Sequence, residues 1–362
     1  MSAAKGGKNV NLQELCSRIT GPSEQAAVAA RQQWDSVAKP LGSLGLLEDA
    51  VIRIAALNGE KNISIHPRAV LVFCADNGVV QEGISQSSSD VTALVAGNIT
   101  KGEASVCHMA ARADAKVLAI DMGMKEAVPG CLNRRIAAGT GNIARGPAMR
   151  REQAEDAILC GAELVRDLKE QGYRLLATGE MGIGNTTSSS AVASALLGLA
   201  PSLLTGRGAG LSDSGLKRKI AVVEQALAVN RPDPKDPIDV LAKLGGFDIA
   251  AMCGVFLGGA AYQLPILLDG LISCVSALLA YRLCPQSRKA MLASHCSAEP
   301  AARLLLEALE LSAPIQAGLR LGEGSGAVCL MPLLDMALSV YEEMSTFEQI
   351  GLTAYSHLEG KA

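Results

Sequence analysis

The densest group of residues suited to chemistry is the segment 179–198, GEMGIGNTTSSSAVASALLG. Its glycines let an anion come close to the backbone, and N–H groups at the start of the following Ala-rich helix attract negative charge. Thr186, Thr187 and Ser188 add hydroxyl donors. The spacing is not that of a Walker A loop. Helix capping explains one hydroxyl but not three glycines and an Asn, so the segment predicts a phosphate-binding turn.

Two glutamates stand beside glycines, where small neighbours leave a carboxylate open to a ligand. Glu180 lies in GEMG, and Glu323 lies between two glycines in RLGEGSGAVCLMPLL, at the start of an apolar helix. A carboxylate that a pocket desolvates has a raised pKa and becomes suited to act as a general base. A glutamate favoured by the helix dipole is the ordinary interpretation of Glu323 from the residues alone. We hypothesise that both carboxylates converge on one cleft, as paired carboxylates do in glycosyl transfer.

Three other segments carry weaker signals. TGRGAGLSDSGLKRKI places residues 217–219 on a helix, where one cation can reach a phosphate, although a solvated basic face is the usual explanation. LASHCSAEP sets Ser and His at a strand end without the G-x-S-x-G elbow of a hydrolase. FCADNGVVQEGIS places Asp76 and Asn77 after a strand, which suits a binding turn or any βα loop. Four histidines without ligand spacing predict no metal site.

Alternating apolar runs and helical patterns must position these residues, and they predict an α/β fold with a parallel sheet. The expected strands are residues 69–74, 116–121, 175–180, 265–269 and 291–294. Polar or glycine residues follow each strand, where open α/β sheets hold their sites. Long helices are expected over 151–171 and 216–230. The first 60 residues and the tail from Pro332 also have helical patterns, and we expect the two ends to meet.

These patterns predict a small helical domain of residues 1–60 plus 340–362 beside a large α/β domain of residues 61–339. Of the 362 residues, 49% are hydrophobic and 19% charged, which excludes general disorder. A net charge of −3, spread without long charged runs, argues against a nucleic-acid partner. The ten cysteines form no C-x-x-C pair, and with no apolar leader visible near the start they favour a reducing cytoplasm.

The segment 249–268 has no charged residue over twenty positions, which is long enough to span a bilayer. Three glycines, Gln263 and Pro265 interrupt it, and an aspartate stands at each end. We therefore interpret it as a buried Ala/Gly-rich helix that runs into a short buried strand, and we expect no membrane span.

Ten segments in order together resemble the nicotinate-nucleotide–dimethylbenzimidazole phosphoribosyltransferases of cobamide assembly. They are KPLGSLGLLE, ADNGVVQEGIS, DVT, GNIARGPAM, GEMGIGNTT, GRGAGLSDSG, KLGGFDIAAM, PILLDG, SHCSAEP and RLGEGSGA. Each segment alone is weak, but their order over nearly the whole chain is specific. The resemblance implies a Rossmann-like, mostly parallel sheet flanked by helices, with a small helical domain.

The resemblance also implies a reaction, in which the 5-phosphoribosyl group of nicotinate mononucleotide moves to a nitrogen of 5,6-dimethylbenzimidazole with inversion, and nicotinate leaves. Glu323 matches the catalytic glutamate, which we expect to act as a general base, and Glu180 matches a second glutamate that orients the substrate. No metal or organic cofactor is implied. The residues expected to hold the nucleotide and its phosphate are Gly182, Gly184, Asn185, Thr186, Thr187, Lys219 and Ser297.

The acceptor is less closely defined by the resemblance. The residues expected to contact it are Asp76, Asn77, Ser85, Ser87, Val95 and Leu321. The family commonly has Asp-His-Gly where this chain has Asp76-Asn77-Gly78, and some relatives have a polar residue in place of Val95. Some relatives work as a pair of paralogous chains that ribosylate phenol or p-cresol. A homodimer, a heterodimer with such a paralogue, and a silent supporting subunit of such a pair therefore stay open.

Overall fold

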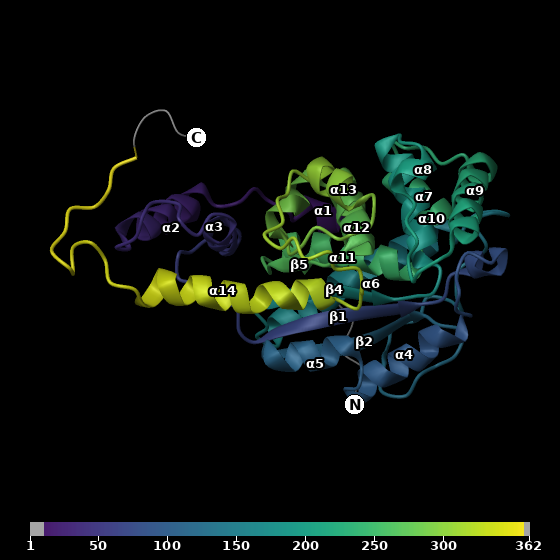
Figure 1. The fold of residues 1–362 in the computed structure, drawn as a ribbon, viewed down its shortest axis with the longest axis horizontal. Helices are drawn as coiled ribbons and strands as arrows, with labels where there is room; N and C mark the ends of the chain where they lie inside the picture. Colours follow the sequence, from purple (N-terminus) through teal and green to yellow (C-terminus); the bar gives the residue numbers. More distant parts are fainter. Residues whose placement is uncertain (1–10, 358–362) are drawn as a thin grey trace.

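A parallel six-stranded sheet forms the centre of the computed structural model, which describes residues 11–357 (Figure 1). The strand order is β3-β2-β1-β4-β5-β6, and each neighbouring pair is parallel. The strands are β1 (Arg68–Ala75), β2 (Ala115–Gly123), β3 (Leu132–Asn133), β4 (Leu175–Met181), β5 (Ile266–Leu268) and β6 (Met291–Ala293). The five predicted strands and their parallel α/β arrangement are confirmed. Strand β3 was not predicted, because two exposed residues make no apolar run.

The strand order reverses between β1 and β4. From β1 the chain continues outward to β2 and β3, and after β3 it crosses back to β4 on the other side of β1. Cys74 of β1 lies opposite both Asp121 of β2 and Met181 of β4, so the three strands end at nearly the same level. Open α/β sheets bind ligands outside the carboxyl ends of the strands at such a reversal. This topology directs attention to the loops that follow β1 and β4.

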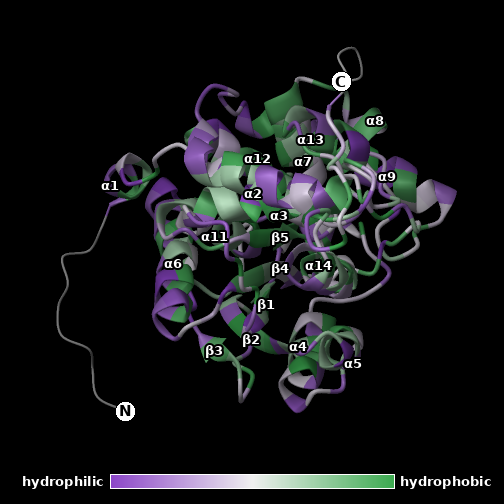
Figure 2. Ribbon diagram, turned by 90° about the vertical axis from the view of Figure 1, so that its left-hand side faces the viewer, coloured by the Kyte–Doolittle hydropathy of each residue, from purple (hydrophilic) through white to green (hydrophobic). Residues whose placement is uncertain are grey.

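Helices cover both faces of the sheet, because each strand alternates its side chains between the two faces. Leu71 and Phe73 of β1 pack in the core shared with α6, α11 and α12, whereas Val70 and Val72 pack in the core shared with α3, α5 and α14. The hydrophobic strands lie inside and the polar helix faces outside (Figure 2). The helices are α1 (Leu12–Ser17), α2 (Glu24–Ser36), α3 (Leu46–Asn58), α4 (Asp90–Lys101), α5 (Ser105–Arg112), α6 (Arg151–Glu170), α7 (Asn185–Leu197), α8 (Pro201–Leu204), α9 (Asp213–Asn230), α10 (Pro237–Leu244), α11 (Phe247–Ala261), α12 (Leu271–Leu283), α13 (Ala302–Ala308) and α14 (Ser325–Glu343), with 3₁₀ turns η1 (Gly78–Glu82) and η2 (Pro285–Ala290).

The uncharged segment 249–268 forms a buried helix and a buried strand, as predicted. Helix α11 is buried over nearly its whole length, and β5 follows it after a short turn. Glycines allow α11 to pack very closely on α6, because a Cβ on Gly161 would lie 1.9 Å from the carbonyl oxygen of Ala251. A Cβ on Gly254 would similarly lie 1.8 Å from the carbonyl oxygen of Ile158. The contact with α6 accounts for Gly254 and Gly258 in the apolar run, while Gly259 lies against Leu264 and Ile266.

In the described part of the chain, α14 is the helix whose length and composition would allow it to cross a bilayer. Its apolar residues, among them Leu330, Met331 and Leu334, are buried against the sheet and the neighbouring helices. The helix begins at Ser325, so Pro332 lies inside it. It ends at Glu343, although the helical pattern of the tail continues beyond that residue. Burial of this kind is typical of a core helix.

Helix α2 and the segment that follows α14 meet at the far end of α14. Trp34 of α2 packs against Tyr341 of α14 with ring centroids 4.9 Å apart, and Val37 forms a β-bridge with Thr346. Helices α2 and α3 lie at the opposite end of the molecule from α7 to α10 (Figure 1). Helix α1 packs instead against α6 and α11 of the α/β body. The exact boundaries of the small helical domain, 1–60 plus 340–362, stay a prediction.

Candidate active site

Two adjoining cavities open at the carboxyl ends of the central strands. The larger has a volume of about 310 Å³ and lies among the residues that follow β4, β5 and β6 and those that precede α14. The smaller has a volume of about 80 Å³ and lies between the turn after β4 and the loop before α9. The two cavities share the lining residues Gly182, Ile183, Asn185, Thr186, Gly208 and Ala209. Together they form one divided site at the reversal of strand order.

The smaller cavity is built for an anion. Lys219 of α9 is 1% exposed, and its Nζ donates a hydrogen bond of 2.8 Å to Thr186 Oγ1. Burial lowers the pKa of Lys219 to about 8, and the charge of Glu299 acts in the opposite direction. The lining residues include a second cation, Arg207, and no carboxylate. A buried ammonium bonded only to a hydroxyl is poorly compensated, and a bound phosphate would supply the missing charge.

The predicted glycine turn connects the two cavities. Gly184 has a φ of +95°, and a Cβ there would lie 2.9 Å from the side chain of Val80. A side chain at this position is therefore excluded by both strain and space. The turn leads directly into α7, so that Asn185 and Thr186 face the cavities. Thr187 faces the core instead, where its hydroxyl is buried without a hydrogen-bond partner, and it lines neither cavity.

An unusual backbone conformation presents Glu323 to the larger cavity. Glu323 has a φ of +61° and stands between Gly322 and Gly324, with φ values of +87° and +88°. A left-handed conformation costs a non-glycine residue about 1–2 kcal/mol, and such strain concentrates at functional sites. The buried Asp269, which follows β5, holds this turn in place. Its carboxylate accepts the N–H groups of Gly324 and Gly326 at 3.1 and 2.8 Å.

The two glutamates line the same cavity. Glu323 Oε2 accepts a hydrogen bond of 3.1 Å from the Val106 N–H at the start of α5. Gly322 lies so close to the second carboxyl group that a Cβ there would be 2.7 Å from Glu180 Oε1. Gly179 lets β4 lie close to the backbone of Glu323, since a Cβ on Gly179 would lie 2.5 Å from the carbonyl oxygen of Glu323. The hypothesis of converging carboxylates agrees with this geometry, and the role of each glutamate stays a prediction.

Glu180, which is partly exposed to the larger cavity, is linked to a buried acid. The amide Nδ2 of Asn185 donates to Glu180 Oε2 and, at 2.9 Å, to Oδ2 of Asp248, which is fully buried at the start of α11. Burial raises the pKa of Glu180 to about 8. The charges of Asp248, Asp269 and Glu323 act in the same direction, and the bond from Asn185 opposes them. Burial also raises the pKa of Asp248 to about 6. At neutral pH Glu180 is therefore a carboxylic acid that can donate a hydrogen bond.

Replacing Glu180 with Gln should stabilise the protein at high pH. A carboxyl group with a raised pKa supports the folded state below its unfolded pKa near 4.5, and this support is lost as the pH rises through about 8. Glutamine mimics the neutral acid at every pH. We expect the melting temperature of Glu180→Gln to exceed that of the wild type by several degrees at about pH 9 and to match it at about pH 5. An equal difference in melting temperature at both pH values would contradict the raised pKa of Glu180.

The residues expected at the acceptor separate into two groups. Ser87, Val95 and Leu321 line the larger cavity, and Ser85 lines the smaller one. Ser297, expected at the nucleotide, also lines the larger cavity, where its Oγ donates to the carbonyl oxygen of Leu319. These residues come from segments far apart in the sequence and meet at one site.

Asp76 and Asn77 line neither cavity. Both are buried beneath the glycine turn, where a Cβ on Gly184 would lie 3.3 Å from Asn77 Cβ. Asp76 Oδ2 accepts the Lys125 N–H at 2.7 Å, so that this carboxylate ties the loop after β1 to the loop after β2. Their position supports the turn and does not offer a direct contact with an acceptor.

Sequence reasoning did not single out Asp248 and Asp269. Both occur in segments that were noted, KLGGFDIAAM and PILLDG, but no local pattern distinguishes a buried structural aspartate from a solvated one. The position of Asp269 at the end of a predicted buried strand was the available signal. Asp248 had none, because its partner Asn185 lies on a different helix.

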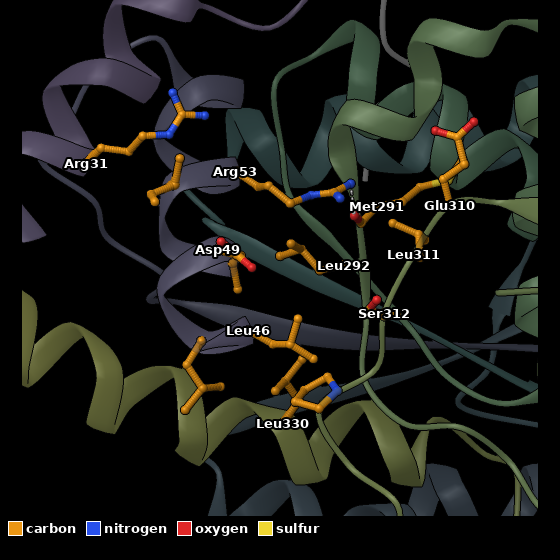
Figure 3. Close-up of a pocket in the computed structure, with 15 residues that line it drawn as sticks. Arg31, Leu46, Asp49, Arg53, Met291, Leu292, Glu310, Leu311, Ser312 and Leu330 are labelled. Carbon is orange, nitrogen blue, oxygen red and sulfur yellow. Dashed lines mark hydrogen bonds between the residues drawn. The ribbon is translucent and has the colours of Figure 1, made fainter. Parts of the chain in front are cut away.

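A further cavity of about 320 Å³ lies between α3, β6 and the segment 310–314 (Figure 3). Figure 3 shows Arg53 pointing toward Met291, whose carbonyl oxygen accepts a hydrogen bond of 2.8 Å from the Arg53 guanidinium. The Arg288 carbonyl oxygen accepts a second bond at 3.0 Å, so this cation is already occupied. Asp49 and Glu310 offset the charge of Arg31 on the walls. None of the residues predicted for the site lines this cavity, and it is not the candidate active site.

Comparisons with known proteins identify the family of this chain. Residues 19–352 match a family model described as Phosphoribosyltransferase. The chain is therefore a phosphoribosyltransferase by class, an enzyme that transfers a pentosyl group. A protein of Ruminiclostridium cellulolyticum named nicotinate-nucleotide–dimethylbenzimidazole phosphoribosyltransferase is 46% identical over 352 residues, which cover 97% of this chain and 100% of the relative. A protein of Escherichia coli with the same name is 43% identical, covering 92% of this chain and 94% of the relative.

A solved structure gives the same result. The enzyme of that name from Thermus thermophilus superimposes with a TM-score of 0.85 at 40% identity, covering 92% of this chain and 100% of that one. This chain belongs to the nicotinate-nucleotide–dimethylbenzimidazole phosphoribosyltransferase family. The predicted family and the predicted Rossmann-like sheet are confirmed.

Proposed function

We propose that this chain transfers the 5-phosphoribosyl group of nicotinate mononucleotide to 5,6-dimethylbenzimidazole or a related aromatic base, giving an α-ribotide and nicotinate. The observation that carries the proposal is the divided site itself. A cavity with the buried Lys219 and no carboxylate adjoins a cavity walled by Glu180 and Glu323. One part suits a phosphate, and the other suits a sugar carbon under attack.

The donor is held by its phosphate. Lys219 and the turn of Gly182 and Gly184 surround the smaller cavity, while Thr186 offers its hydroxyl to both cavities. Binding energy from the phosphate fixes the anomeric carbon beside the glutamates, although the phosphate itself does not react.

The reaction needs a base more than an acid. The bond between the anomeric carbon and the nicotinate nitrogen breaks with its electron pair going to the ring nitrogen, which loses its positive charge and needs no proton. The acceptor nitrogen attacks the opposite face of the oxocarbenium-like carbon. As that bond forms, Glu323 accepts the proton that the acceptor base loses. Glu180, protonated at neutral pH, donates a hydrogen bond that orients the ribose.

The larger cavity suits a flat aromatic acceptor. One part of its wall is apolar and consists of Val91, Val95, Leu271, Ile272 and Leu321, while Glu180 and Glu323 line another part. An apolar wall beside a few convergent polar groups matches a methylated aromatic ring.

The purified chain alone, incubated with nicotinate mononucleotide and a panel of acceptors, tests this function. We expect release of nicotinate and formation of an α-ribotide with dimethylbenzimidazole, both followed by chromatography. Turnover of phenol or p-cresol in preference to the bases would assign the chain to the phenol-ribosylating type. Absence of turnover with every acceptor, restored by adding a paralogous chain, would make it a supporting subunit.

We further propose that the chain works as a dimer in the cytoplasm. Leu94 and Leu321 are 66% and 56% exposed, and Val95 and Leu321 line the larger cavity, so apolar surface surrounds the mouth of the site. A second chain would cover such surface. Light scattering should give a particle of about twice 37.4 kDa. A species of 37.4 kDa with full activity would contradict the proposal, and the homodimer and heterodimer are distinguished by expressing the chain alone.

A further inference from the structure

The side chain of Asn185 joins two carboxyl groups that come from different elements. Its Nδ2 donates to Glu180 Oε2 at the end of β4 and, at 2.9 Å, to Asp248 Oδ2 on the first turn of α11. Asn185 and Asp248 are 4% and 0% exposed, and Asp248 lines neither cavity. An ionised carboxylate only accepts hydrogen bonds, so Asp248 must face the nitrogen of the amide and not its oxygen. Asp248 therefore fixes the direction in which the Asn185 amide points.

The oriented amide offers one polar atom to the site. Both hydrogens of Nδ2 are used by Glu180 and Asp248, whereas Oδ1 has no hydrogen-bond partner within residues 11–357. Because Asn185 lines both cavities, Oδ1 is the acceptor that it presents there. Glu180 lines the larger cavity beside this amide, and at neutral pH its carboxyl group is protonated and can donate. A donor and an acceptor side by side match a hydroxyl group, which both accepts and donates.

The hydroxyl that meets this pair is the one on the ribose carbon next to the anomeric carbon. In the proposed function, on which this inference rests, the phosphate held at Lys219 sets the anomeric carbon beside Glu180 and Glu323. Hydrogen bonds to the neighbouring 2′-hydroxyl strengthen as that carbon becomes oxocarbenium-like, so they favour the transition state. We infer that Asp248 is a positioning residue that, by orienting Asn185, makes the enzyme select donors with a 2′-hydroxyl over 2′-deoxy donors.

The wild-type protein tests this selectivity without any variant. We expect kcat/KM with 2′-deoxy nicotinate mononucleotide to be at least about 10²-fold lower than with nicotinate mononucleotide, because a site that pairs a hydroxyl rejects an analogue without it. In solution the deoxy donor is the more reactive one, since a 2′-hydroxyl withdraws electrons from the neighbouring carbon. Equal or faster turnover of the deoxy donor would therefore overturn the inference. Turnover of neither donor with any acceptor is a different result, which would overturn the proposed function and this inference with it.

Asp248→Leu removes the acceptor that orients the amide. We expect the selectivity to fall at least about tenfold, the usual effect of one lost hydrogen bond, through a lower kcat with the ribose donor. The matched control is Asp121→Leu, because Asp121 is also buried but pairs with Arg135 at 3.0 Å and lines neither cavity. Selectivity is a ratio of two rates on one preparation, so it does not depend on the fraction of a variant that folds. Unchanged selectivity in Asp248→Leu, or an equal loss in Asp121→Leu, would contradict the role of Asp248.

Asp248→Asn separates the hydrogen bond from the charge. Its oxygen can still accept the Asn185 amide, and its nitrogen would take the place of Asp248 Oδ1. That oxygen and Asn77 Oδ1 both lie beside Gly246, since a Cβ there would be 2.4 Å from the first and 2.8 Å from the second. The new nitrogen therefore finds an acceptor. We expect Asp248→Asn to keep the selectivity that Asp248→Leu loses, and a loss in both variants would contradict the orienting hydrogen bond.

The pH dependence of kcat at saturating donor then measures the charge of Asp248. Burial raises the pKa of Glu180 to about 8. The charges of Asp248, Asp269 and Glu323 act in the same direction. Asp248 is ionised at that pH, because burial, with a contribution from the charge of Asp76, raises its own pKa only to about 6. Since kcat needs protonated Glu180, its fall at high pH should move about one unit lower in Asp248→Asn. A fall at the same pH as in the wild type would overturn the placement of Asp248 beside Glu180.

Discussion

Glu323→Gln should lower kcat by about 10²–10⁴-fold, because positioned acid–base catalysis has that typical magnitude. Glutamine retains the length of the side chain and an oxygen that accepts the Val106 N–H, so the hydrogen bond seen for Glu323 Oε2 is kept. The backbone strain between Gly322 and Gly324 is also unchanged. Donor affinity should therefore stay within a few-fold of the wild type. Steady-state kinetics at saturating substrates and calorimetry with the donor measure the two effects separately.

Glu310→Gln is the matched control for this variant. Glu310 is also a glutamate with a positive φ, +52°, but its carboxylate pairs with Arg288 away from the two cavities. We expect it to turn over normally. A more acidic acceptor that arrives deprotonated should restore part of the rate of Glu323→Gln. If Glu323→Gln itself turned over within a few-fold of the wild type, Glu323 would not be the base, and Glu180 would be the next candidate.

Lys219→Met should weaken donor binding by about 30–1000-fold, the usual cost of removing one partner of a buried charged hydrogen bond. Methionine has a similar length and no charge. Because Lys219 in the free protein is bonded only to the Thr186 hydroxyl, its removal should not lower the melting temperature without donor. If Lys219 served only to stabilise the fold, Lys219→Met would lower the melting temperature and leave donor affinity unchanged. Calorimetry with nicotinate mononucleotide and thermal unfolding provide the two measurements.

The pH dependence of donor binding gives an independent test of Lys219. With a pKa of about 8, the ammonium is protonated below that pH and binds phosphate, and wild-type affinity should fall as the pH rises through about 8. Lys219→Met should show no such fall. The control is Lys217→Met, which changes a lysine on the same helix that is not buried. A similar loss of donor affinity in Lys217→Met would indicate a general field effect in place of a specific contact.

Local patterns in the sequence predicted the features that depend on neighbouring residues. Apolar runs predicted five strands, since a strand buried on both faces needs continuous hydrophobic residues. The turn around Gly184 was predicted because glycine with a positive φ is a property of the residue itself. Glycine neighbours drew attention to Glu180 and Glu323, and the family resemblance supplied the role expected of each. Interrupting glycines also identified α11 as a core helix before its contact with α6 was known.

The tertiary structure alone decided which polar groups are buried, and with which partners. Three consecutive basic residues, 217–219, are alike in sequence, and only packing buries Lys219 while leaving Lys217 accessible. Asp76 and Asn77 resemble binding residues, yet the chain covers them with the turn after β4. The raised pKa of Glu180 arises from burial and from the charges of Asp248 and Asp269, which reach it only when β4, α11 and β5 come together. Desolvation and charge interactions depend on distances in space, and the linear sequence does not specify those distances.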